Sequence, residues 1–107
     1  MKKTIKSRED FEKVFRGGKR LNHRLVRATA LRISDNAESR IAIVAAKRLG
    51  NAVHRNRCKR VLRAAAYEAG FPPAGYDVIL FSTNATHDAS SAEVAWALGK
   101  LAKKLGA

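Results

Sequence analysis

The sequence predicts a single α+β two-layer sandwich whose elements follow the order αββαβα. The chain has 107 residues, of which 46% are hydrophobic. That is enough apolar material for one sheet covered by two or three helices, but not for two independent cores. The apolar residues switch between helical spacing and short strand-like runs, and no linker or repeat separates them. We therefore expect residues 1–107 to form one domain.

The first element is a helix over residues 8–16. Ser7 followed three residues later by Asp10 is a capping signature. The helical face that follows carries three apolar residues: Phe11, Val14 and Phe15. Gly17 and Gly18 end the helix, because glycine readily takes the left-handed conformation found at many helix ends.

Two strands come next. Residues 22–33 mix β-branched and apolar residues with three arginines, which is typical of a strand with one charged, solvated face. Residues 34–39 form a polar turn. Residues 40–46 are a nearly continuous apolar run, which predicts a central strand buried on both faces.

The second half of the chain predicts a long helix, a strand and a final helix. Asn51 caps a helix over residues 52–69, and Gly70 ends it. Residues 76–81 form the third strand, and a polar stretch follows it. Ser90 and Glu93 form a capping box for the last helix. Its apolar positions repeat at helical spacing: Val94, Leu98, Leu101 and Leu105. We expect Trp96 in this helix to pack rather than to stack on a base.

The second strand, the long helix and the third strand make up a β-α-β unit. A connection of this length usually joins parallel strands, and its crossover is usually right-handed. On the long helix, an apolar stripe is predicted to pack against the sheet: Cys58, Val61, Leu62 and Ala65.

Charge points to a polyanionic partner. The chain has 22 Lys or Arg against 9 Asp or Glu, a formal net charge of +13. Residues 41–67 contain no acidic residue and seven cations: Lys47, Arg48, Arg55, Arg57, Lys59, Arg60 and Arg63. In a helix face that is only solvated, acidic residues usually alternate with the basic ones and reduce the repulsion between the positive charges. Here that repulsion is expected to be relieved by the phosphate oxygens of a bound partner. Nucleic acid is therefore the favoured partner.

The type of nucleic acid is narrowed by the predicted fold. A helix-turn-helix reader of DNA belongs to a mostly helical domain, whereas this basic helix lies between two strands. A sheet face with aromatic residues near it also offers a place for single-stranded RNA or DNA.

The chain lacks the usual signs of a catalytic or metal site. Its three histidines, His23, His54 and His87, lie far apart, and no carboxylate pair has metal-ligand spacing. Cys58 is the single cysteine, which excludes an internal disulfide and fits a reducing cytosol. No apolar run is long enough to cross a bilayer or to act as a signal peptide. We expect no catalytic residue, no metal site and a cytoplasmic protein.

Residues 47–63 contain the run Arg55-Asn56-Arg57 within an ungapped basic segment. This segment resembles the Arg-Asn-Arg signature of the bacterial ribonuclease P protein subunit family. Residues 10–18 resemble the first helix of that family, and residues 77–80 resemble a later strand. Small departures are Arg48, where the family often has Lys, and Ala64, where an acidic residue or Gln is common.

The resemblance implies a fold and a function. The family fold is an α/β sandwich with an unusual left-handed β-α-β crossover. Its members join a catalytic RNA, and the complex removes the 5′ leader of precursor tRNA. The RNA and its Mg²⁺ ions carry the chemistry, so the protein itself is expected to hold no metal tightly and to need neither a membrane nor an obligate protein partner.

The resemblance also assigns residues to two surfaces. The surface that faces the catalytic RNA comprises Lys47, Arg48, Asn51, His54, Arg55, Asn56, Arg57, Lys59, Arg60 and Arg63. A cleft between the first helix and the sheet holds the leader, with Phe11 and Phe15 as its aromatic residues.

Several alternatives remain open from the sequence. Phe11 and Phe15 also fit a core stripe, His54 also fits a partly exposed helix residue, and the basic segment 2–8 is either a solvated arm or a further phosphate contact. A small ribosomal or other structural RNA-binding protein would have the same size and charge. A stand-alone nuclease would need a catalytic constellation that the sequence lacks.

Overall fold

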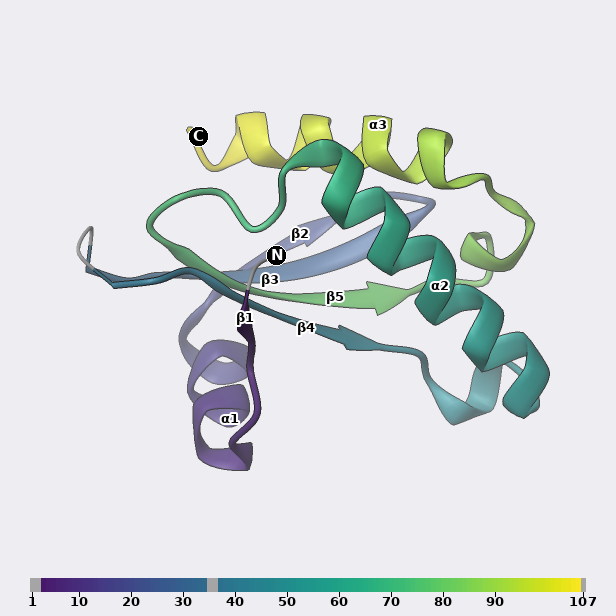
Figure 1. Ribbon diagram of the computed structural model, residues 1–107, viewed down its shortest axis with the longest axis horizontal. Coiled ribbons are helices and arrows are strands. Elements are labelled where there is room, and N and C mark those ends of the chain that lie inside the picture. The colour runs from purple at the N-terminus through teal and green to yellow at the C-terminus, as the bar shows by residue number, and fades with distance from the viewer. Residues whose placement is uncertain (1–2, 35–36, 107) are drawn as a thin grey trace.

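The computed structural model describes residues 3–34 and 37–106, which form a five-stranded sheet, three α-helices and two short 3₁₀ helices (Figure 1). The strands are β1 (Lys3–Thr4), β2 (Lys19–Asn22), β3 (Val26–Arg32), β4 (Arg40–Val44) and β5 (Tyr76–Ser82). The helices are α1 (Arg8–Gly17), η1 (Lys47–Leu49), α2 (Ala52–Ala69), η2 (Thr86–Asp88) and α3 (Ser91–Lys104). The predicted basic segment 2–8 and the predicted turn 34–39 therefore lie partly outside the described residues.

The sheet has the order β1-β4-β5-β3-β2. β5 pairs parallel to β4 and antiparallel to β3, and β2 pairs antiparallel to β3. β5 is the buried central strand, with four consecutive buried residues from Asp77 to Leu80. The predicted central strand 40–46 is wrong in this respect: β4 ends at Val44 and is only half-buried, because the next strand beyond it is the two-residue β1.

The predicted strand 22–33 is in fact the last residue of one strand, β2, and the whole of another, β3. The chain turns at residues 23–25, where the His23 amide donates to the carbonyl of Val26 at 3.0 Å. The His23 ring closes the turn further, since its Nδ1 accepts from the Leu25 amide at 3.1 Å. No glycine or proline marks this turn, which is why the sequence pattern runs through it.

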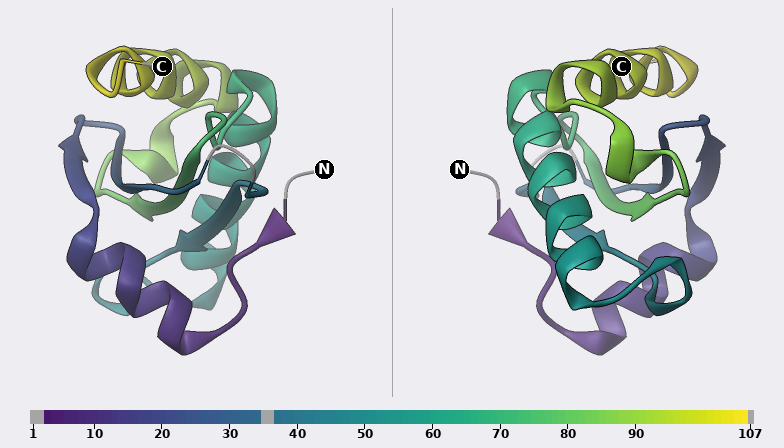
Figure 2. Two further views of the ribbon diagram at one scale, coloured as in Figure 1. Left: turned by 90° about the vertical axis from the view of Figure 1, so that its left-hand side faces the viewer. Right: turned by 90° about the vertical axis from the view of Figure 1, so that its right-hand side faces the viewer.

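Alternate residues of the strands face two apolar clusters on opposite sides of the sheet. The larger cluster lies between the sheet and the helices α2 and α3, and it includes Val78 and Leu80 of β5. The smaller cluster lies under α1 and contains Ile79 of the same strand. Figure 2 shows α2 and α3 on one side of the sheet and α1 on the other.

The crossover from β4 through α2 to β5 is left-handed, as Figures 1 and 2 show. The right-handed connection expected from the general rule is therefore wrong, and the family resemblance gave the correct hand. The hand of the crossover follows from the strand order together with the face of the sheet that α2 covers. With β5 placed between β4 and β3, a right-handed path would put α2 on the face that α1 covers and would leave the larger cluster open.

The helix ends follow the predicted caps, with one difference. Asn51 and Gly70 flank α2 as predicted, and Gly70 has the left-handed φ of 70°. Gly18 ends α1 in an extended conformation with φ of −82°, so the left-handed explanation is wrong there. The reason is space: a Cβ on Gly18 would lie 2.6 Å from the carbonyl oxygen of Val14 and 2.8 Å from Cγ2 of Thr29.

The capping box of α3 is present as predicted. The Ser90 hydroxyl accepts from the Glu93 amide at 3.1 Å, and the Glu93 carboxylate accepts from the Ser90 amide at 3.0 Å. Trp96, however, is 60% exposed, so the packing role predicted for it is wrong. The buried stripe of this helix is filled by Val94, Leu98 and Leu101, which leaves Trp96 on the outer side.

Candidate nucleic-acid interface

The basic helix α2 begins at a tightly built corner. Gly50 has φ of 154°, and a Cβ there would lie 2.6 Å from Cγ of His54. Asn51 then caps the helix, its side-chain oxygen accepting from the His54 amide at 3.0 Å. Gly50 therefore lets the chain turn closely around the His54 ring, a requirement that the sequence alone did not reveal.

The first turns of α2 are tied to η2. The rings of His54 and His87 stack with centroids 4.1 Å apart and planes 6° from parallel. Nε of Arg57 donates to the carbonyl of His87 at 2.8 Å. Nε2 of His54 and Nε of Arg55 are buried and have no hydrogen-bond partner among the described residues. Such atoms call for a water or a partner molecule.

The side of α2 that faces the sheet is apolar, as its sequence predicts. The predicted apolar stripe is buried: Val61, Leu62 and Ala65 belong to the larger cluster, and Cys58 is 0% exposed. Burial raises the pKa of the Cys58 thiol, so this thiol stays protonated. Cys58 is a packing residue.

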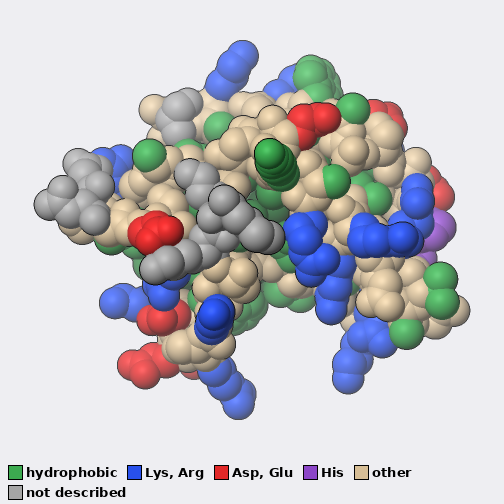
Figure 3. All heavy atoms as spheres, viewed as in Figure 1, with side chains coloured by type: hydrophobic (Ala, Val, Ile, Leu, Met, Phe, Trp, Pro, Cys, Tyr) green, Lys and Arg blue, Asp and Glu red, His purple; other side chains and the backbone are tan. Residues whose placement is uncertain are grey.

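Ten residues predicted to face the catalytic RNA lie on η1, α2 and the corner between them. Seven are exposed: Lys47, Arg48, Asn51, Asn56, Arg57, Arg60 and Arg63. Three are half-buried: His54, Arg55 and Lys59. In the described part of the chain, no cation of α2 pairs with a carboxylate. Figure 3 shows Lys and Arg side chains gathered over α2 on one face of the molecule.

The aromatic residues of α1 lie on the opposite side of the sheet. Val14 is the core residue of α1, at 1% exposure, whereas Phe11 is half-buried and Phe15 is 38% exposed. Phe15 stacks on Phe11 with centroids 6.3 Å apart and meets the ring of Phe81 on β5 edge-on at 6.0 Å. The structure therefore brings both predicted phenylalanines together and adds a third.

The sheet face next to Phe15 carries a row of side chains that crosses four strands. Val44 is in register with Phe81, Phe81 with Arg27, and Arg27 with Asn22. Arg27 and Asn22 are exposed. We call these four residues the sheet row. It combines an aromatic ring with a cation and an amide, as surfaces for single-stranded nucleic acid do.

Arg20 stands beside this row, with its guanidinium 5.3 Å from the centre of the Phe15 ring. Arg20, Arg27 and Phe81 were not predicted as site residues. The arginines within the predicted strand 22–33 indicated a charged face, but only Arg27 lies on the sheet face beside α1, because Arg24 is in the turn and Arg32 points to the other face of β3.

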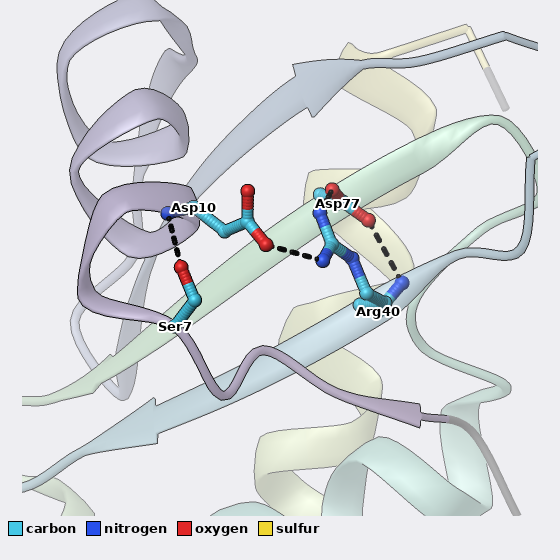
Figure 4. Close-up of polar contacts among 4 residues, drawn as sticks. All are labelled: Ser7, Asp10, Arg40 and Asp77. Carbon is cyan, nitrogen blue, oxygen red and sulfur yellow. Dashed lines mark hydrogen bonds and ion pairs between the residues drawn. The ribbon is translucent and has the colours of Figure 1, made fainter.

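Ion pairs fix α1 on the sheet (Figure 4). The guanidinium of Arg40 on β4 donates to Asp10 of α1 and to Asp77 of β5, both at 2.8 Å. Asp77 also accepts from the Arg40 amide at 2.9 Å. The two carboxylates raise the pKa of Arg40 above its already high ordinary value. Asp10 is in turn the residue whose amide donates to the Ser7 cap at 3.0 Å.

Comparison of the sequence with known proteins shows the family of this chain. A family model described as Ribonuclease P matches residues 1–106. The chain belongs to the ribonuclease P protein family. The ribonuclease P protein component of Oceanobacillus iheyensis is 34% identical over 104 residues, covering 95% of this chain and 85% of that protein. That of Exiguobacterium sibiricum is 33% identical over 104 residues, covering 95% of this chain and 89% of that protein.

Solved structures of RNase P proteins share the fold. That of Staphylococcus aureus superposes with a TM-score of 0.79 at 23% identity, covering 98% of this chain and 96% of its own. That of Thermotoga maritima gives a TM-score of 0.71 at 22% identity, covering 97% of this chain and 94% of its own. Members of the ribonuclease P protein family act in an endoribonuclease that matures the 5′ end of tRNA, in which an RNA subunit is catalytic.

Among the described residues, no group of three or more His, Cys, Asp or Glu side chains is placed to hold a metal ion. Within the same residues, no helix is both long and apolar enough to cross a bilayer.

Proposed function

We propose that this chain, acting as a single RNA-binding domain in the cytoplasm, holds two RNAs on opposite sides of its sheet. The basic side of α2 binds the catalytic RNA of ribonuclease P. The sheet row and the phenylalanines of α1 bind the 5′ leader of precursor tRNA. The observation that carries the proposal is that the cations of α2 and the phenylalanines of α1 lie on opposite sides of the sheet. One small protein can therefore contact the catalytic RNA and the substrate at the same time.

The α2 surface suits a folded RNA with closely spaced phosphates. Exposed Arg57, Arg60 and Arg63 stand on one helix, and none of them pairs with a carboxylate of the described residues. Each guanidinium can bind phosphate oxygens in a bidentate way, and the release of counterions adds to the affinity. η1 extends the same surface with Lys47 and Arg48.

The opposite surface suits an unpaired strand. Bases of single-stranded RNA stack on exposed aromatic rings, and cations beside the rings bind the connecting phosphates. Phe15 and Phe81 supply the rings, and Arg20 and Arg27 supply the cations. Mature tRNA has no leader, so this surface favours the precursor over the product.

The chemistry belongs to the RNA subunit and to the Mg²⁺ ions that it and the substrate hold. Among the described residues, no group of side chains is placed to hold a metal ion. The contribution that we propose for this chain is electrostatic. Two RNAs repel each other through their phosphates, and divalent ions reduce this repulsion. A protein with a net charge of +13 does the same.

Reconstitution tests the proposal. The cognate catalytic RNA is assayed for precursor tRNA cleavage over a range of Mg²⁺ concentrations, with and without the protein. The proposal expects the protein to shift half-maximal cleavage to a lower Mg²⁺ concentration. An unchanged Mg²⁺ dependence would count against it. Cleavage by the protein without any RNA would instead revive a stand-alone nuclease.

A further inference from the structure

A second exposed aromatic site lies on α3, beside the turn that follows Asn22, the last residue of the sheet row. Trp96 contacts the edge of the His23 ring, with centroids 6.1 Å apart and planes 86° from parallel. Nζ of Lys100 lies 4.1 Å from the centre of the indole ring. At 60% exposure, the indole presents much of its surface to solvent. An exposed indole with a cation on its ring offers a surface on which a base can stack.

Trp96 forms one wall of a hollow between α3 and the turn that joins β2 to β3. Figure 1 shows this turn beside the first half of α3. The hollow has a volume of about 570 Å³ and is lined by His23, Arg24, Leu25, Ala92, Glu93 and Trp96. Leu25 is buried and gives the hollow an apolar wall, while Arg24 is exposed at its rim. This mixture of an aromatic ring, an apolar wall and a cation suits a nucleobase with its phosphate.

The surroundings of the hollow are positively charged. Burial lowers the pKa of His23, and the charges of Lys100, Arg24 and Lys104 lower it further. The single acidic residue that lines the hollow is Glu93. Its carboxylate is engaged by the Ser90 amide in the capping box, which lowers its pKa. The net field at the hollow therefore attracts a phosphate.

The hollow lies next to the end of the sheet row, at the edge of the sheet and on the side that α3 covers (Figure 2). Asn22 ends this row on β2, the last strand of the sheet. The next two residues, His23 and Arg24, line the hollow. RNA that crosses from Phe81 past Arg27 to Asn22 would therefore pass around this edge of the sheet, at the turn, to reach Trp96 on the α3 side.

We propose that this hollow binds an unpaired nucleotide of the leader beyond the part that lies on the sheet, with Trp96 stacking on the base and Arg24 and Lys100 contacting the phosphates. This inference rests on the proposed function, because it takes the sheet row as the leader surface. Duplex RNA does not fit, since its bases are already paired and stacked. The hollow thus extends the leader surface toward the 5′ end of the substrate and makes affinity depend on leader length.

Fluorescence tests the hollow directly, because Trp96 is the only tryptophan of the chain. The full-length protein is titrated with a short single-stranded RNA and with a blunt-ended duplex of the same length, while the anisotropy of labelled RNA reports total binding. Stacking predicts that the single strand quenches Trp96 and that the duplex leaves its emission unchanged. Binding of the single strand without any change in Trp96 emission would overturn the proposal. Equal quenching by both RNAs would do the same, since it would indicate a general polyanion site.

The reconstituted holoenzyme tests the role in substrate binding. Two precursors are compared, one with a leader that ends on the sheet row and one with a leader that extends past Asn22. Trp96→Ala should weaken binding of the long-leader precursor by about fivefold to a hundredfold, the range for loss of one stacked base, and leave the short-leader precursor unchanged. Trp96→Phe should restore part of the affinity, and Lys103→Ala on the same helix is the matched control. Equal affinity of Trp96→Ala and wild type for the long leader would overturn the proposal.

A second variant separates loss of stacking from loss of stability, and a second measurement separates the hollow from the proposed leader surface. If Trp96→Ala lowers the thermal midpoint, Arg24→Glu serves as the second variant, because Arg24 is exposed and its charge reversal repels phosphate. If wild-type holoenzyme binds precursor and mature tRNA equally, the proposed leader surface fails. The fluorescence titration with free RNA still reports on the hollow in that case.

Discussion

Arg40 and Asp77 form the ion pair on which the position of α1 depends, with Nη2 of Arg40 donating to Oδ2 of Asp77 at 2.8 Å. The Asp77 side chain is 3% exposed, so its charge is compensated within the protein. The other end of the guanidinium holds Asp10 on α1. Among the described residues, the smaller apolar cluster under α1 contains four buried side chains, so these polar contacts matter for holding Phe11 and Phe15 beside the sheet.

Arg40→Ala should lower the free energy of unfolding by about 3–5 kcal/mol, because it leaves the Asp77 carboxylate buried without its partner. Urea denaturation measures this. Arg8→Ala is the matched control: its pair with Glu12 spans 3.8 Å on the surface of α1, and its loss should cost no more than about 0.5 kcal/mol. Equal stability of the two variants would show that Arg40 does not anchor α1.

Phe15→Ala should reduce the affinity for precursor tRNA by about 1–3 kcal/mol and hardly change the affinity for mature tRNA. Its partial exposure, at 38%, predicts a small change in the thermal midpoint. Val14→Ala is the control, because Val14 is 1% exposed and its truncation should lower stability by about 2 kcal/mol and all activities together. A lowered midpoint for Phe15→Ala with an unchanged precursor-to-mature ratio would make Phe15 a core residue instead.

Gly50→Ala should weaken binding of the catalytic RNA, because the new Cβ would meet the His54 ring at 2.6 Å and separate it from His87. Filter binding with the catalytic RNA measures the affinity. Gly99→Ala is the matched control, since no atom lies within 4 Å of a Cβ there, and alanine should stabilise α3 by about 0.5–1 kcal/mol. Wild-type RNA affinity for Gly50→Ala would show that the corner before α2 tolerates a shift of His54.

The pKa of His23 should lie below its ordinary value of 6.5, and Lys100→Ala should raise it toward that value. A proton NMR titration of the three histidines measures both. Because the folded state disfavours protonated His23, unfolded chains bind more protons as the pH falls below 6.5. Stability therefore decreases from that pH down to the lowered pKa of the folded state. Lys103 is not among the charges that act on His23, so Lys103→Ala should leave the titration unchanged.

The parts of the fold that depend on neighbouring residues could be predicted from the sequence. Asn51, Gly70 and the Ser90–Glu93 box set the ends of α2 and α3, because caps are contacts between residues three or four positions apart. The buried stripe of α2 follows from helical spacing in the same way. The left-handed crossover could not be derived locally, because it depends on which face of the sheet the other helices cover.

The candidate site also has a part that could be predicted from neighbouring residues and a part that could not. The cations of α2 lie close together in the sequence, on one predicted helix, so the sequence alone predicts the surface that they share. The leader surface joins Phe15, Arg27 and Phe81, which meet only through strand pairing and the placement of α1. Residue type gave Phe11, Val14 and Phe15 the same apolar role, whereas packing buries Val14 and leaves Phe15 partly open.

The central claim is that exposed cations of α2 contact phosphates of the catalytic RNA, and the salt dependence of binding tests it most directly. Arg60 is the best residue to change, because it is exposed and, unlike Arg57, makes no hydrogen bond to η2. A plot of log affinity against log salt concentration should be shallower for Arg60→Ala by about one unit, the loss of one phosphate contact. Lys13→Ala, an exposed cation of α1, should keep the wild-type slope. A wild-type slope for Arg60→Ala together with a shallower slope for Lys13→Ala would contradict the account and move the RNA interface to the other side of the sheet.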